Sequence, residues 1–63
     1  MNISDYERDN LHIALGKLAE AKRFLVNTAA ISDDVNLVSS VDAITGELSE
    51  VETSLLMTLS HED

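Results

Sequence analysis

The fold is decided by residues 37–55, LVSSVDAITGELSEVETSL, where apolar side chains recur at alternating steps of four and three residues. The members of this row are Leu37, Val41, Ile44, Leu48, Val51 and Leu55. Such spacing places one apolar side chain per turn on a single face of an α-helix, as at the contact between helices of a coiled coil. We therefore predict a helix over about residues 33–59 that packs against another helix.

The first half of the chain carries a matching row with the steps in the opposite order. Its members are Leu11, Ala14, Leu18, Ala21 and Leu25. If the chain folds back near Ile31, each position of this row faces one position of the second row, as Leu18 faces Ile44. The small alanines then meet large aliphatic residues, which favours close packing of two antiparallel helices.

The predicted helix ends rest on polar capping residues. Residues 4–7, Ser-Asp-Tyr-Glu, match a capping box and predict a first helix over about residues 5–29. The break is expected at residues 32–34, Ser-Asp-Asp, because these residue types cap a new helix and suit its dipole. A second capping pattern at residues 39–42, Ser-Ser-Val-Asp, supports an alternative with three helices, the second of them short.

The chain is too short to bury a large core by itself. Its 63 residues form one domain at most, residues 1–63, and an all-α hairpin of this size is marginal. There is no cysteine for a disulfide, and His12 and His61 lie too far apart for a zinc site. We therefore expect the hairpin to assemble into a four-helix bundle dimer or a higher oligomer.

A second apolar stripe on the first helix indicates a partner. Its members are Tyr6, Ile13, Phe24 and Ile31. At about 100° per residue these side chains lie within about 20° of one another, on the side opposite the Leu18 row. A helix that is apolar on two sides is normally buried on two sides, so we predict an interface with another chain here, in its simplest form a second copy in a two-fold four-helix bundle. The alternative is that these are ordinary exposed apolar residues at the surface.

The charge of the chain argues against direct binding to nucleic acid. The net charge is −8, and all four basic residues lie in the first 23 positions. Binding to phosphates depends on lysine and arginine, which the second half lacks. Asp42, Glu47 and Glu50 form an acidic group on the second helix that either faces a partner or is a solvated helix surface.

The sequence offers no pattern typical of an enzyme, a cofactor site or a metal site. His12 is the only internal candidate base, and neither glycine belongs to a phosphate-binding loop. The first ten residues carry three acidic side chains and no apolar run, so no secretory signal is expected. No stretch approaches the roughly 20 apolar residues of a membrane span. We expect a cytoplasmic protein that does not bind membranes.

Two functional hypotheses follow. The first is a non-enzymatic protein-interaction module, a small acidic helical oligomer that regulates or inhibits a larger protein by docking on it. The alternative is a polyanion mimic whose acidic helix blocks the basic cleft of a nuclease or DNA-binding protein. Capture of a small molecule between protomers is a third class. Small acidic helical proteins are common among products of phages and mobile elements, and we expect such an origin.

Overall fold

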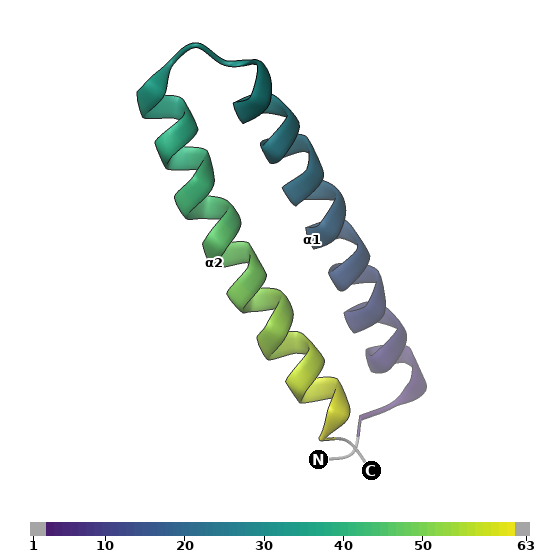
Figure 1. Cartoon of the computed structure of the whole chain (residues 1–63). Helices are drawn as coiled ribbons and strands as arrows, with labels where there is room; N and C mark the ends of the chain where they lie inside the picture. Colours follow the sequence, from purple (N-terminus) through teal and green to yellow (C-terminus); the bar gives the residue numbers. More distant parts are fainter. Residues whose placement is uncertain (1–2, 62–63) are drawn as a thin grey trace.

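Two antiparallel helices form a hairpin in residues 3–61, the part of the chain that the computed structural model describes. Helix α1 spans Asp5–Ile31 and helix α2 spans Val35–Ser60, and the two lie side by side (Figure 1). The Cα radius of gyration is 14.7 Å and the extents are 47 × 15 × 10 Å. A compact chain of this length would have a radius of about 11 Å. The prediction of an all-helical hairpin is confirmed, and the hairpin is thin and elongated.

The capping residues decide where each helix begins. The Ser4 hydroxyl accepts a hydrogen bond from the Glu7 amide, and the Glu7 carboxylate accepts one from the Ser4 amide, so the predicted capping box is confirmed. Asp34 caps α2, because its carboxylate accepts hydrogen bonds from the amides of Asn36 and Leu37 at 2.9 and 3.2 Å. Helix α2 therefore begins two residues later than predicted.

Two other boundaries differ from the sequence-based expectation. Helix α1 continues to Ile31 instead of ending near residue 29, and within it the Thr28 hydroxyl donates to the Phe24 carbonyl at 2.8 Å. This bond satisfies the hydroxyl inside the helix, so Thr28 does not end it. Helix α2 is continuous through residues 39–42, and the three-helix alternative is wrong.

The contact between the helices follows part of the predicted rows. Leu11, Leu18 and Leu25 of α1 are half-buried, as are Leu48 and Leu55 of α2, and Val41 is the only buried residue of 3–61, at 4% exposure. The remaining members of the predicted α2 row are Leu37, Ile44 and Val51, which stay 41–46% exposed. Their places in the contact are taken by Val38, Thr45 and Glu52, which are half-buried.

The register of the two helices also differs from the predicted one. The connection of residues 32–34 is centred on Asp33, not on Ile31. In the predicted register Lys22 would lie level with Ser40, about 18 Å along the helix from Glu52, at 1.5 Å per residue. Lys22 nevertheless pairs with Glu52, at 2.5 Å. Side chains tilt toward the N-terminus of their helix, so Lys22 tilts away from the turn and Glu52 tilts toward it. A turn centred on Asp33 instead of Ile31 shortens the remaining separation along the helices.

Candidate functional site

The four residues of the predicted interface are exposed on α1. Tyr6, Ile13, Phe24 and Ile31 are between 57% and 86% exposed. They lie about 120–140° around the helix from Leu18, which faces α2. We call these four residues the outer stripe. It runs for about 37 Å along α1, because its first and last members are 25 residues apart.

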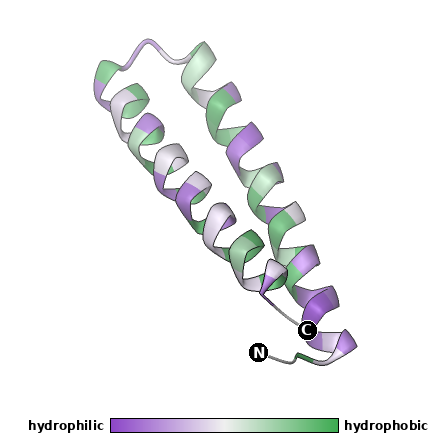
Figure 2. Cartoon of the chain, turned by 60° about the horizontal axis from the view of Figure 1, so that its bottom comes forward, coloured by the Kyte–Doolittle hydropathy of each residue, from purple (hydrophilic) through white to green (hydrophobic). Residues whose placement is uncertain are grey.

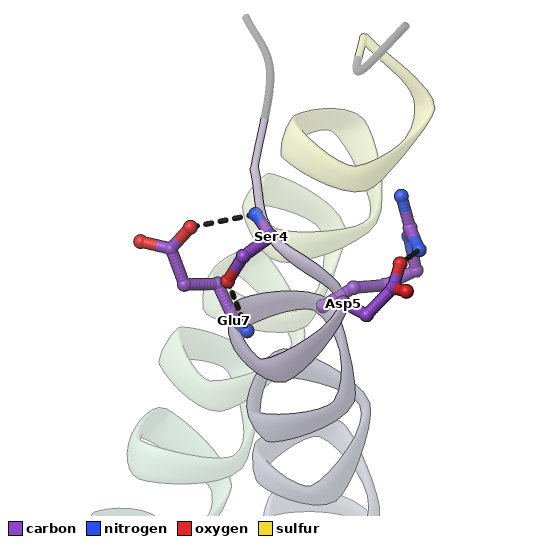
Figure 3. A network of polar contacts seen from close by, with 4 residues as sticks. Ser4, Asp5 and Glu7 are labelled. Carbon is purple, nitrogen blue, oxygen red and sulfur yellow. Dashed lines mark hydrogen bonds and ion pairs between the residues drawn. The ribbon is translucent and has the colours of Figure 1, made fainter.

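Polar contacts hold the N-terminal end of the outer stripe in helical conformation. Tyr6 lies between the two members of the capping box, and Asp5 forms an ion pair with Arg8 at 2.7 Å (Figure 3). The hydrogen bond that the Ser4 backbone amide donates to the Glu7 carboxylate is the main cause that lowers the pKa of this carboxyl. The Ser4 side chain lowers the pKa further. The negative charge of Glu7 also suits the positive end of the α1 dipole.

At Phe24 the outer stripe has a cation beside its aromatic ring. The Arg23 guanidinium carbon lies 5.8 Å from the centre of the Phe24 ring, near the outer limit for a cation–π contact. The ring itself remains exposed. Phe24 is therefore a large apolar side chain, flanked by positive charge, that α2 does not cover.

A further apolar row lies on α2, and the sequence placed it wrongly inside the contact between the helices. Leu37, Ile44 and Val51 are spaced seven residues apart and are exposed along one side of the helix. Figure 2 shows hydrophobic segments that recur along both helices, apart from the hydrophilic N-terminal end of α1, and do not gather in one patch. The regular spacing of these residues in the sequence indicated an apolar row on a helix. The spacing alone does not determine which of several apolar rows one partner helix can cover.

The three acidic residues predicted to face a partner lie on the exposed side of α2. Asp42, Glu47 and Glu50 are all exposed. Around the helix Glu50 lies between the other two, about 60° from Glu47 and about 80° from Asp42. Glu47 and Glu50 are the nearest neighbours of the three.

A polar cluster missed by the sequence-based reasoning connects the two helices. The Lys22 ammonium contacts Glu52 and also donates to the Ser49 hydroxyl at 3.2 Å. Hydropathy assigns a lysine and a glutamate to the solvent surface, so no pattern in the sequence indicated this contact. This polar cluster lies along one side of the helix–helix contact, and the apolar row of Leu37, Ile44 and Val51 lies along the other side.

Residues 3–61 contain no pocket and no group of three side chains that would suit a metal ion. Within the same residues neither helix combines the length and the apolar character that crossing a bilayer requires. No protein-family model matches the sequence, and neither a curated protein nor a solved structure matches this chain. The arrangement of exposed side chains is accordingly the basis for the proposals below.

Proposed function

We propose that this chain is a non-enzymatic protein-interaction module, a small acidic helical oligomer that regulates or inhibits a larger protein by docking on it. The observation that carries the proposal is the outer stripe, which is exposed on the side of α1 away from α2. Full burial of one large apolar side chain contributes about 1.5–3 kcal/mol. Covering the outer stripe is therefore a substantial source of binding free energy.

The stripe fits one recognised way in which helices bind proteins. An amphipathic helix can lay an apolar face into a groove of its partner, with anchors one or two turns apart. Tyr6 and Ile13 lie seven residues apart, as do Phe24 and Ile31, so the members of each pair are close to two helical turns apart and point in nearly the same direction. The partner surface should be an apolar groove with a basic rim, because the net charge of −8 favours approach to positive charge.

Capture from extracts of the native host tests the outer stripe. A tagged parent chain is compared with Phe24→Asp and with the matched control Ala19→Asp, which adds the same charge at an exposed position on another side of α1. We expect the parent and Ala19→Asp to retain the same protein and Phe24→Asp to lose it. Equal capture by all three chains would contradict docking through the outer stripe.

The second candidate function, polyanion mimicry, is supported by the neighbouring carboxylates of Glu47 and Glu50. The chain has no lysine or arginine after Arg23, so nothing basic on α2 offsets them. Binding of the captured protein is measured for Glu47→Gln/Glu50→Gln and for the parent, across about 50 to 500 mM salt. Mimicry predicts slower association and weaker salt dependence for the variant. Docking through the outer stripe predicts near-equal binding.

A further inference from the structure

The apolar rows of the two helices extend past their mutual contact onto one face of the hairpin. On α2 the row that contains Val41 is covered by α1, while the adjacent row that contains Ile44 is exposed. The polar pair Lys22–Glu52 lies on the opposite side of the covered row. We call the exposed apolar side the flank face. It comprises the exposed Leu37, Ile44 and Val51 of α2, with the exposed Ala21 and the half-buried Ala14 of α1.

We infer that a second copy of this chain covers the flank face, in a two-fold four-helix bundle with both turns at the same end. In such a bundle each helix contacts two neighbours, so its apolar surface points between them. The rows in this chain have that arrangement, because Val41 is covered by α1, whereas Ile44 lies about 60° around α2 from Val41 and stays exposed. The regular spacing in residues 37–55 is thus the pattern of a bundle core, of which one hairpin covers only half.

The exposed area of the hairpin supports association through a face of this size. A single chain exposes 4622 Å². A compact protein of the same mass would expose about 4000 Å². The excess is similar to the roughly 800 Å² that each partner contributes to a typical stable interface. A second copy on the flank face would remove it, and both helices of each copy would take part.

The sizes of the facing residues favour turns at the same end. In that arrangement α1 of one copy lies beside α2 of the other at the same height as within the hairpin. Ala14 then meets Val51 of the second copy and Ala21 meets Ile44 of the second copy, so a small residue faces a large one at both levels. With turns at opposite ends, alanines meet alanines and large aliphatics meet each other, which requires unequal helix spacings.

Charge at the rim of the flank face favours the same arrangement. Lys17 precedes Leu18 and Glu47 precedes Leu48, so each lies about 100° from the covered row, at the outer edge of the flank face. With the turns together, Lys17 lies beside Glu47 of the second copy. With the turns apart, Lys17 lies near Lys17 of the second copy, and like charges repel. Both ends of the hairpin are acidic, with Asp33 and Asp34 at the turn and Asp5 and Glu7 at the other end. Acidic ends therefore meet in both arrangements, so their repulsion favours neither.

This inference rests on the self-association included in the proposed function. Distances between spin labels test the arrangement of the two copies separately from whether they associate. The chain has no cysteine, so Asp33→Cys gives one labelling site, in the turn. We expect sedimentation to show a dimer, and a dipolar electron resonance distance of about 15–30 Å between the two labels, since neighbouring helices lie about 10 Å apart. Ala19→Cys, near the middle of α1, serves as the control, with a similar distance in either arrangement.

A dimer with a turn-to-turn distance above about 40 Å would overturn the inference but not self-association, because the hairpin is 47 Å long. A monomer would overturn both. The face itself is tested by Ile44→Asp, which we expect to raise the dissociation constant at least about 100-fold, because a carboxylate would be buried without a partner. Ala19→Asp, which adds the same charge on the other side of α1, should leave the dissociation constant within about threefold. An unchanged dissociation constant for Ile44→Asp, or a raised one only in Ala19→Asp, would overturn the inference.

Discussion

Lys22 of α1 and Glu52 of α2 form an ion pair across the helix–helix contact, with 2.5 Å between Nζ and Oε1. Both side chains are half-buried, and the Ser49 hydroxyl accepts a second hydrogen bond from the same ammonium group. The pair joins residues 30 positions apart in the sequence. It therefore constrains both the register of the helices and the side on which polar groups enter their contact.

Removing one member of this pair should cost more than removing both. Glu52→Ala leaves a half-buried ammonium group with Ser49 as its remaining partner, and we expect a loss of about 1–2 kcal/mol in the free energy of unfolding. Lys22→Met/Glu52→Leu replaces the pair by apolar side chains and should be at least as stable as the parent. Urea unfolding of the parent, the single variant and the double variant measures both effects. A single variant as stable as the parent would show that the ion pair does not stabilise the hairpin.

Charge on the two sides of α1 should have opposite consequences for folding. Leu18 faces α2, so Leu18→Asp buries a carboxylate without a partner and should unfold the chain. Phe24 is exposed, so Phe24→Asp should keep the helical content of the parent. Far-ultraviolet circular dichroism at equal concentrations compares the three proteins. If both variants remain fully helical, the assignment of the two sides of α1 is wrong.

Acid should weaken the N-terminal end of α1 through Glu7. The pKa of its carboxyl is lowered in the folded chain relative to the ordinary value of 4.5. Its contribution to stability is therefore present above that value and is lost as the pH falls through the lower, folded-state pKa. Glu7→Gln keeps an acceptor for the Ser4 amide but does not titrate, so the parent should lose more stability than the variant over this range. Melting temperatures at a series of pH values provide the test, and parallel curves would contradict it.

Alanine should be tolerated at both glycines. A Cβ atom added at Gly16 or at Gly46 would meet nothing within 4 Å. Each substitution should therefore stabilise the helix by about 0.5–1 kcal/mol, because alanine loses less backbone entropy on folding. Denaturant unfolding of each single variant checks this value. A clear loss of stability at either position would reveal another chain packed closely against that glycine.

Added salt should raise the melting temperature modestly. Eight acidic residues and no lysine or arginine follow Asn27, and four of the eight lie in α2, so like charges repel one another in the second half of the chain. Screening by salt reduces this repulsion in the folded state more than in the extended unfolded chain. Melting in sodium chloride from about 50 to 500 mM measures the effect. A falling melting temperature would mean that attractive ion pairs such as Lys22–Glu52 dominate the electrostatics.

Features that depend on neighbouring residues could be predicted from the sequence. The capping box joins positions three residues apart, so Ser4 and Glu7 identified the start of α1 without knowledge of the rest of the fold. The spacing of apolar residues likewise identified both helices and the exposed outer stripe. Local patterns failed where the packing of the whole helix competes with them. Ser39 and Asp42 match a cap, but α2 continues through them because Val38, Val41 and Thr45 pack in one contact with α1.

The sequence by itself determined two amphipathic helices, an antiparallel hairpin and an apolar stripe that α2 does not cover. Only the tertiary structure decided which row beside Val41 enters the contact. Hydropathy favours the row of Leu37, Ile44 and Val51, yet the row of Val38, Thr45 and Glu52 is the one covered. Lys22 and Glu52 can be half-buried there because their charges meet, and this pairing depends on two residues that only the folded chain brings together.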